Sequence, residues 1–374
     1  MINNQSTLFK ENVNRAKAII LNKEKTINVL DDILILKNIN KIKQSFLEIK
    51  DNLKNSKNDK IGLLNIDSNG DAIVVNNQLL IKEIDQIVDS ITLERTLYYT
   101  KRLKKILSEI KTSRINDINL NRWKEYDDII TDSLWVLNRR DNSGAHIGWY
   151  WGNFIPQIPN QFLRRYTKSE DWVLDPFLGS GTTLIECKHL GRNGIGIELQ
   201  DKVANAAVKL IEKEKNTQNI KTSVIIGDST DLNIKSELSK LGIKSVQLLL
   251  MHPPYWDIIK FSNDKRDLSN AKNIQDFLLM LGKVVDNTYD ILDRGRYFGL
   301  VIGDKYSKGE WIPLGFYCMQ EVLKRGYQLK SIIVKNFEET KGKRNQKELW
   351  RYRALVGGFY IFKHEYIFLF KKVK

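Results

Sequence analysis

The sequence predicts a doubly wound α/β fold with an antiparallel last strand, preceded by a mostly helical N-terminal region. Two observations support this class. Beyond about residue 145, short apolar runs alternate with amphipathic stretches, which is typical of a largely parallel sheet covered by helices. Residues 1–140 contain no proline, since all six prolines lie beyond Gly148, and their apolar residues recur at helical spacing. We therefore expect two domains, 1–140 and 145–374.

The N-terminal region has helical spacing in two separate stretches. Apolar residues recur through 27–34 and again through 81–91. Residues 55–78 interrupt this pattern, and Asn69-Gly70 predicts a short hairpin there. No repeat of fixed period is visible in the sequence.

Seven apolar runs in the C-terminal region predict strands. In chain order these are 172–174, 194–197, 223–226, 246–251, 297–302, 331–334 and 360–370. We expect the last run to pair with 331–334 as an antiparallel edge of the sheet.

The composition narrows the class of partner. The 374 residues include 60 Lys and Arg against 45 Asp and Glu, so the net charge of +15 favours a polyanion, either nucleic acid or an acidic membrane surface. Two cysteines exclude a disulfide framework, and the four histidines lack metal-ligand spacing, so no metal site is expected. No apolar run approaches the roughly 18 residues that span a bilayer, and no signal peptide is visible. We expect a soluble intracellular protein without a membrane partner.

The first stretch that carries chemistry is VLDPFLGSGTTLIECKHLGRNGIGIEL, residues 173–199. A strand ends at Asp175, a glycine turn follows, and Thr182 opens a helix. Such glycines let backbone N–H groups approach a ligand closely at a helix N-terminus. Glu198, at the end of the next strand, suits the two hydroxyls of a ribose. A phosphate-binding loop is disfavoured because GxxxxGK[ST] is absent, and Leu184 replaces the third glycine of the dinucleotide pattern GxGxxG.

The second stretch is VQLLLMHPPYWDIIKFS, residues 246–262, where a buried strand runs into two prolines and two aromatic residues. Consecutive prolines fix the backbone and remove its N–H donors, which leaves carbonyl groups facing the crevice. A tyrosine beside them offers a flat surface. This combination can accept hydrogen bonds from an amino group while it stacks on a planar ring.

Together the two stretches resemble the S-adenosylmethionine-dependent amino-methyltransferases that act on the exocyclic nitrogens of DNA bases. DPFLGSGTT is similar to the cofactor motif DPFxGSGTT, and HPPY matches [DNS]PPY in three of four places. The resemblance covers about residues 146–370 and implies a Rossmann-like methyltransferase sheet with S-adenosylmethionine as cofactor. It implies a catalytic motif made of His252, Pro253, Pro254 and Tyr255.

The resemblance also implies a set of cofactor-binding residues. Glu198 would hold the ribose hydroxyls, Asp228 would contact the adenine, and the others would surround the methionine part. Those others are Phe154, Pro156, Asp175, Phe177, Gly179, Ser180, Gly181 and Thr182.

The chemistry of an aromatic amine explains the motif. The lone pair of such a nitrogen is delocalised into the ring, so acceptors for its protons are needed to make it nucleophilic. The Pro253 carbonyl and the His252 side chain would supply them, and Tyr255 would stack on the base once it has left the duplex. No covalent intermediate is expected, because the Pro-Cys pair of cytosine-carbon methyltransferases is absent.

His252 departs from the family pattern, which has Asp, Asn or Ser at that place, and this leaves the target base open. Trp256 directly after Tyr255 is similar to the cytosine-N4 set, whereas overall frequency favours adenine N6. Of the two bases, we favour adenine.

Duplex DNA is the expected partner, together with a cognate restriction endonuclease, in a cytoplasmic and nucleoid-associated protein. Residues 340–353 combine basic and aromatic side chains, which neutralise phosphates and stack on exposed bases. Helical residues 1–140 would serve sequence recognition or dimerisation. The expected DNA-binding residues are Lys260, Lys341, Lys343, Arg344, Lys347, Arg351 and Arg353. Lys260, Lys265 and Arg266, just after the catalytic motif, could gate the entry of the base.

Three alternatives stay open at this point. An RNA methyltransferase acting on guanine N2 uses similar motifs, usually behind an RNA-binding domain that is not visible here. A catalytically inactive DNA-binding protein is conceivable because of His252. A small-molecule methyltransferase would leave the basic stretch at 340–353 unexplained.

Overall fold

The computed structural model describes residues 18–54, 61–64, 71–337 and 347–373. The chain forms two compact units. Unit 1 comprises Met1–Arg114 and Ile118–Asp128, and unit 2 comprises Ile115–Asp117 and Ile129–Lys374. The boundary expected between residues 140 and 145 is therefore too late. Residues 129–140 belong to unit 2, since the side chain of Trp135 is only 1% exposed and lies in that unit's core.

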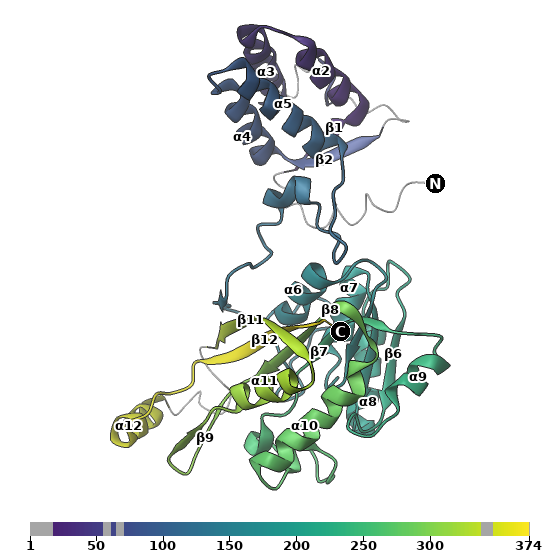
Figure 1. Cartoon of the computed structure of the whole chain (residues 1–374), viewed down its shortest axis with the longest axis vertical. Coiled ribbons are helices and arrows are strands. Elements are labelled where there is room, and N and C mark those ends of the chain that lie inside the picture. Colours follow the sequence, from purple (N-terminus) through teal and green to yellow (C-terminus); the bar gives the residue numbers. More distant parts are fainter. Residues whose placement is uncertain (1–17, 55–60, 65–70, 338–346, 374) are drawn as a thin grey trace. The chain divides into compact units, whose positions relative to one another are not determined.

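In the residues that the structure describes, unit 1 combines a two-stranded ribbon with four α-helices. The ribbon pairs β1 (Ala18–Asn22) with β2 (Ala72–Asn76) in antiparallel register. The helices are α2 (Lys23–Ile35), α3 (Ile39–Lys54), α4 (Asn77–Val88) and α5 (Leu93–Ser108), and a short helix, η3 (Leu120–Glu125), follows (Figure 1). One apolar cluster joins the inner side of the ribbon to the helices. The expectation of a mostly helical N-terminal region is confirmed.

Unit 1 contains a strand–helix–helix repeat that the sequence did not reveal. The strand sequences are AIILN and AIVVN, and each final asparagine caps the helix that follows. In the ribbon, Ala18 faces Asn76 and Asn22 faces Ala72, so an approximate twofold axis relates the two halves. The predicted turn at Asn69-Gly70 lies outside the described residues, and β2 pairs with the distant β1.

Unit 2 is built on an eight-stranded sheet in the order β3-β11-β12-β8-β7-β4-β5-β6. Every recorded pair of neighbours is parallel except the two that β12 makes. The strands are β3 (Leu134–Trp135), β4 (Trp172–Asp175), β5 (Asn193–Glu198), β6 (Thr222–Ile226), β7 (Val246–Met251), β8 (Leu292–Ile302), β11 (Tyr327–Asn336) and β12 (His364–Lys372). A separate hairpin joins β9 (Lys305–Ser307) and β10 (Glu310–Ile312).

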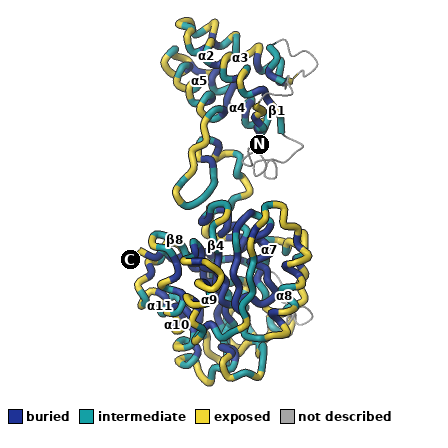
Figure 2. Tube along the Cα trace, turned by 90° about the vertical axis from the view of Figure 1, so that its right-hand side faces the viewer, coloured by how far each residue is buried: buried dark blue, intermediate teal, exposed yellow. Residues whose placement is uncertain are grey.

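Helices cover both faces of this sheet. On one face, α6 (Gln157–Tyr166), α7 (Thr182–Leu190) and α8 (Asp201–Lys213) pack on the strands. On the other face lie α9 (Ile234–Lys240), α10 (Ile274–Tyr289) and α11 (Leu314–Lys324). Strand residues alternate between the two layers, since Leu248 and Leu250 join the first and Leu249 and Met251 the second. Figure 2 shows the buried strands between the two helix layers.

Further helical segments lie in the connections between the strands of unit 2. The loop after β7 contains η4 (Trp256–Ile258) and η5 (Leu268–Asn270), and α12 (Lys347–Gly357) lies between β11 and β12. None of the helices in the described residues is long and apolar enough to cross a membrane.

The doubly wound fold is confirmed, with one correction to the sheet. Six of the seven predicted runs lie within strands, although β8 and β11 begin earlier than predicted. The seventh run, 360–370, is only partly a strand, because β12 begins at His364. The pairing of β12 with β11 is antiparallel, as expected, but β12 is not at the edge. It lies between β11 and β8, and the two-residue β3 forms that edge. A strand of two residues carries no readable pattern in the sequence.

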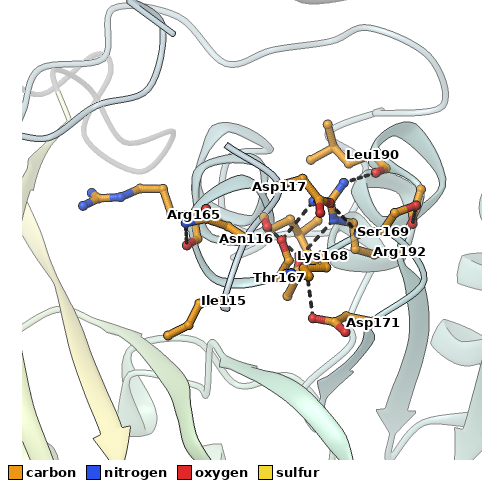
Figure 3. A network of polar contacts seen from close by, with 12 residues as sticks. Ile115, Asn116, Asp117, Arg165, Thr167, Lys168, Ser169, Asp171, Leu190 and Arg192 are labelled. Carbon is orange, nitrogen blue, oxygen red and sulfur yellow. Dashed lines mark hydrogen bonds and ion pairs between the residues drawn. The ribbon is translucent and has the colours of Figure 1, made fainter. Parts of the chain in front are cut away.

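The three residues Ile115–Asp117 belong to unit 2 because polar contacts hold them there (Figure 3). The Asn116 amide donates to the carbonyl of Arg165 at 2.7 Å. Asp117 accepts from the backbone N–H of Ser169 at 2.6 Å and from the guanidinium of Arg192 at 3.1 Å. Arg192 is almost fully buried, and Asp117 is its ion-pair partner.

Candidate active site

The two predicted motifs meet at the carboxyl ends of the parallel strands. The glycine turn follows β4 and the HPPY motif follows β7, and these strands are hydrogen-bonded neighbours. The chain order reverses direction across the sheet between them, which is where doubly wound folds bind ligands. A cavity of about 610 Å³ lies there, and residues from both motifs line it.

The glycine turn is held from beneath by Asp175. Its carboxylate accepts from the Thr183 hydroxyl at 2.5 Å and from the Phe177 backbone N–H at 3.0 Å. Gly179 and Gly181 have φ of 52° and 85°, a region that favours glycine, and Gly181 is the N-cap of α7. Burial raises the pKa of Asp175 to about 6. The turn is therefore a rigid support for the cavity wall.

The predicted cofactor residues divide into two groups. Those that line the cavity are Phe154, Phe177, Gly179, Thr182, Glu198 and Asp228. Asp175, Ser180, Gly181 and Pro156 do not line it. They act behind the wall, because Ser180 accepts from the Asn153 amide at 2.6 Å and Pro156 is the N-cap of α6.

Glu198 ties the turn to the next strand. Its Oε2 accepts from the Gly179 N–H at 2.9 Å and its Oε1 accepts from the Gln200 N–H at 3.0 Å. Burial raises its pKa, and these two hydrogen bonds oppose the rise. Each oxygen retains acceptor capacity toward the cavity.

Asp228 is positioned similarly after β6. Its Oδ1 accepts from the backbone N–H and the hydroxyl of Thr230, at 2.9 and 2.8 Å. Across the cavity, the ring of Tyr150 stacks on Phe261 at 5.7 Å between centroids and lies against Gly179. The sequence reasoning gave neither aromatic residue a role: Tyr150 precedes both stretches, and Phe261 lies past the HPPY motif within the second one.

The HPPY motif forms the other part of the cavity wall. His252, Pro253, Pro254 and Tyr255 all line it. The His252 ring lies 5.0 Å from the Phe154 ring between centroids, and its Nε2 is 3.1 Å from the Tyr255 hydroxyl. Gly303 lies against the Tyr255 ring, where a larger residue would collide with it. Burial lowers the pKa of His252 to about 4, so the imidazole is neutral at pH 7.

Trp256 turns away from the cavity. It has a φ of 50°, its indole N–H donates to the Ala271 carbonyl at 3.0 Å, and Lys305 lies 3.9 Å above its ring. It is not among the lining residues. The similarity to the cytosine-N4 set that rested on Trp256 therefore has no bearing on the cavity wall.

The sequence reasoning did not predict an ion pair that lines the cavity. The Glu365 Oε2 accepts from the Tyr255 hydroxyl at 2.8 Å, and its Oε1 accepts from the Lys335 ammonium at 2.8 Å. Lys335 and Glu365 face each other in the register of β11 and β12, and both line the cavity. A glutamate that opens the apolar run EYIFLF was the signal that could have revealed this pair.

A histidine and glutamate cluster lies behind the turn. His146, Glu186 and His189 have ligand atoms within 4.8 Å of one another, so these residues could hold a metal ion. Their contacts are hydrogen bonds: Glu186 Oε1 lies 2.7 Å from His146 Nε2 and 2.9 Å from His189 Nδ1. The Glu186 hydrogen bond raises the pKa of His189 to about 9. A protonated His189 compensates the negative charge of Glu186. The contacts of this cluster therefore hold residues 143–146 against α7.

The expected DNA-binding residues are only partly described. Lys341, Lys343 and Arg344 lie outside the described residues, as does the side chain of Lys347, whose backbone begins α12. Lys260, Arg351 and Arg353 are exposed, and Arg353 lies 5.3 Å from the ring of Trp350. Trp350 lines the cavity, so α12 lies at its mouth. Of the three residues expected to gate the cavity, Lys260 and Lys265 are exposed, and Arg266 lines the cavity and is paired with Asp264.

Comparisons with known proteins agree with this site. A family described as DNA methylase, of the N6/N4 type, matches residues 3–209, more than half of the chain. This match includes the glycine turn and Glu198 but ends before His252. The chain is 52% identical over 103 residues to the Type II methyltransferase M.HindIII of Haemophilus influenzae, and the matched segment covers 27% of this chain and 32% of that protein. It is 35% identical over 102 residues to the Type II methyltransferase M2.DpnII of Streptococcus pneumoniae, covering 26% and 35%.

Shorter and weaker likenesses extend the comparison. A 50-residue segment is 50% identical to the Type II methyltransferase M.MjaII of Methanocaldococcus jannaschii, covering 13% of this chain and 9% of that protein. Among solved structures, TrmN from Thermus thermophilus is similar over 60% of this chain and 50% of the TrmN chain, with 17% sequence identity and a TM-score of 0.39. The matched segments of the three methyltransferases span between 9% and 35% of their lengths. On the match over residues 3–209, the chain belongs to the adenine-N6/cytosine-N4 DNA methylase family.

Proposed function

We propose that this protein transfers a methyl group from S-adenosylmethionine to the exocyclic N6 amino group of a flipped adenine in duplex DNA. One observation carries the proposal. The glycine turn with Glu198 and the HPPY motif line a single cavity, because β4 and β7 are neighbours in the sheet. A cofactor site and an amine site that share one cavity are what direct transfer between them requires.

The residues present fit the cofactor. Glu198 is a buried carboxylate with acceptor capacity toward the cavity, as a ribose diol requires. Gly179 keeps the wall open, because its φ of 52° favours glycine and a Cβ there would crowd the Tyr150 ring at 3.2 Å. Asp228 offers an acceptor for an adenine amino group, and Phe154, Phe177 and Thr182 line the remaining surface. When bound, S-adenosylmethionine supplies a methyl group activated by its sulfonium.

The residues of the HPPY motif would act on the base. The Pro253 carbonyl and the neutral His252 imidazole accept hydrogen bonds from the amino protons, which withdraws the nitrogen lone pair from the ring and makes it nucleophilic. Tyr255, supported by Gly303, presents its ring to the base, and stacking offsets part of the few kcal/mol that flipping costs.

Adenine is the proposed base because the feature that favoured cytosine does not reach the cavity. Trp256 is directed to Ala271 and Lys305 instead. The wider frequency of adenine methylation in this family then decides the proposal. Nucleoside analysis of the methylated DNA distinguishes the two bases directly.

DNA would approach along the mouth of the cavity. Arg351 and Arg353 are exposed on α12, together with the aromatic side chain of Tyr352 and the apolar side chains of Leu355 and Val356. Most of the net positive charge of the chain lies beyond residue 128, in unit 2. A basic surface supplies the salt-sensitive part of DNA binding, while exposed aromatic residues can stack on bases.

The biological setting belongs to the same proposal. The relatives are named Type II methyltransferases, which favours a restriction–modification role with a cognate endonuclease as partner. A cytoplasmic, nucleoid-associated location follows from a DNA substrate. Unit 1, the strand–helix–helix repeat, is the proposed element for sequence recognition or dimerisation.

The test is transfer of radiolabelled methyl groups from S-adenosylmethionine to three substrates: plasmid DNA, tRNA and no nucleic acid. We expect incorporation into plasmid alone, recovered as N6-methyladenine after nucleoside digestion. N4-methylcytosine would correct the base, and incorporation into tRNA alone would establish the RNA alternative. Binding to DNA without incorporation would indicate an inactive protein. Tyr255→Ala and Glu198→Ala should each abolish transfer, and substantial activity in both variants would overturn the assignment.

A further inference from the structure

A buried ion pair lies directly beneath the HPPY motif. The side chains of Lys335 and Glu365 are 6% and 14% exposed, and they join β11 to β12 at the cavity wall. Removing two charges from water is costly, and packed apolar residues would hold two strands together as well. The pair is therefore better explained by what it does to its neighbour, the Tyr255 hydroxyl.

The hydrogen bonds along this chain of residues can run in only one direction. Lys335 only donates, and a charged Glu365 only accepts. The Tyr255 hydroxyl has one proton, which it donates to Glu365 at 2.8 Å. Its oxygen can therefore only accept from the nitrogen 3.1 Å away, which is His252 Nε2. His252 must then carry its proton on Nε2, and its Nδ1 is an acceptor.

The position of that proton matters because His252 replaces an oxygen-bearing residue. Asp, Asn and Ser, the residues of the family pattern, each present an oxygen that can accept from an amino group. A neutral imidazole has one acceptor nitrogen only, and the opposite tautomer would point an N–H at the amino group. Among the described residues, Tyr255 is the one recorded hydrogen-bond partner of His252, so Nδ1 remains available.

We propose that Glu365, held charged by Lys335, acts through Tyr255 to fix His252 as the Nε2–H tautomer, so that Nδ1 accepts from the target amino group. This inference rests on the proposed function for the identity of that amine. Glu365 and Lys335 are positioning residues, since they act on the substrate through Tyr255 and His252.

The electrostatics agree with this arrangement. Burial alone would raise the pKa of Glu365, but the Lys335 ammonium, together with His252 and the hydrogen bonds from Lys335 and Tyr255, lowers it overall. Burial lowers the pKa of His252 to about 4. At neutral pH the Glu365 carboxylate is thus charged and the His252 imidazole is neutral. These are the two protonation states that the proposal requires.

The direct test is the tautomer itself, read from ¹⁵N spectra of histidine-labelled full-length protein without substrate. The protein has four histidines, and His252→Asn assigns the signals of interest. We expect His252 to carry its proton on Nε2. In Glu365→Gln the amide can donate to Tyr255, so the proton should move partly or wholly to Nδ1. An Nδ1–H form in the wild type, or an unchanged tautomer in Glu365→Gln, would overturn the proposal. This readout needs no activity, so it stands apart from any failure of the proposed function.

Kinetics supply a second test through a double-mutant cycle. Glu365→Gln should lower kcat about 10- to 100-fold, as when a group that orients an active-site histidine is removed. In a His252→Asp background, whose carboxylate accepts without a tautomer, the same change should cost no more than about threefold. Equal losses in both backgrounds would indicate a merely structural role. S-adenosylmethionine binding, expected to be unchanged, confirms that each variant is folded. Thermal melting should stay cooperative, with a lower midpoint in Glu365→Gln because the buried Lys335 loses its charged partner.

Lys335→Met adds a pH signature. Without the ammonium, burial raises the pKa of Glu365, so the carboxyl is protonated at low pH and loses its role as acceptor. The rate of Lys335→Met should therefore rise with pH across a range where the wild-type rate is flat. A pH profile parallel to the wild type would contradict the role of Lys335. The groups that act on Glu365 are Lys335, His252 and Tyr255.

Discussion

Replacing Glu198 by glutamine tests the cofactor site most sharply. The two side chains have nearly the same shape, but glutamine has one acceptor oxygen and an NH₂ group. Glu198 uses both oxygens: Oε2 accepts from Gly179 at 2.9 Å and Oε1 accepts from Gln200 at 3.0 Å. In Glu198→Gln, one of these N–H groups must face the new NH₂, and one acceptor toward the cavity is lost.

The expected magnitude follows from those contacts. A hydrogen bond to a charged group contributes about 1.5–3 kcal/mol. Losing one such bond to a ribose hydroxyl should therefore weaken S-adenosylmethionine binding about 10- to 150-fold, at 1.4 kcal/mol for each factor of ten. The lost backbone contact should also lower the free energy of unfolding by about 1–3 kcal/mol.

Calorimetric titration of S-adenosylmethionine and thermal unfolding separate the two effects. Glu212→Gln, an exposed glutamate on α8, is the matched control, and both of its values should equal those of the wild type. If Glu198→Gln lost stability but bound the cofactor with unchanged affinity, Glu198 would only brace the turn. The placement of the ribose beside it would then be refuted.

Three further predictions concern the cluster, the linker and the DNA surface. The folded-state pKa of His189 is raised to about 9, so the stabilisation that its charge provides is complete below pH 6.5 and is lost as the pH rises through 9. Melting curves should therefore show the wild type losing about 1 kcal/mol relative to His189→Gln across that range, and parallel curves would argue against the ion pair. Asp117→Asn removes the ion-pair partner of the buried Arg192 and should cost about 1–3 kcal/mol in chemical denaturation of unit 2, whereas an unchanged midpoint would show that Asp117 is dispensable. Arg351→Ala with Arg353→Ala should reduce the salt dependence of DNA binding by about two phosphate contacts, and an unchanged slope would move the DNA contact to unit 1.

Much of the fold could be predicted because its signals are local. The runs at 172–174 and 246–251 are short, apolar and bounded by turn residues, so they could be identified as strands from the sequence alone. The strand–helix–helix repeat of unit 1 escaped prediction because its two strands, AIILN and AIVVN, are identical at only three of five positions and the helices that follow them differ. The two-residue β3 is too short to have a pattern of its own.

The candidate site divides in the same way. By themselves, the residues of the sequence determined the glycine turn, the carboxylate Glu198 at the end of the next strand and the HPPY motif, since each depends on neighbours along the chain. Only the tertiary structure decided that Asp175 supports the turn from behind, and that Glu365 and Lys335 stand beneath Tyr255. Strand order brings Lys335 of β11 and Glu365 of β12 beside Tyr255, although they lie 80 and 110 residues further along the chain. Pairing between distant strands depends on the packing of the whole sheet, so it leaves no local mark in the sequence.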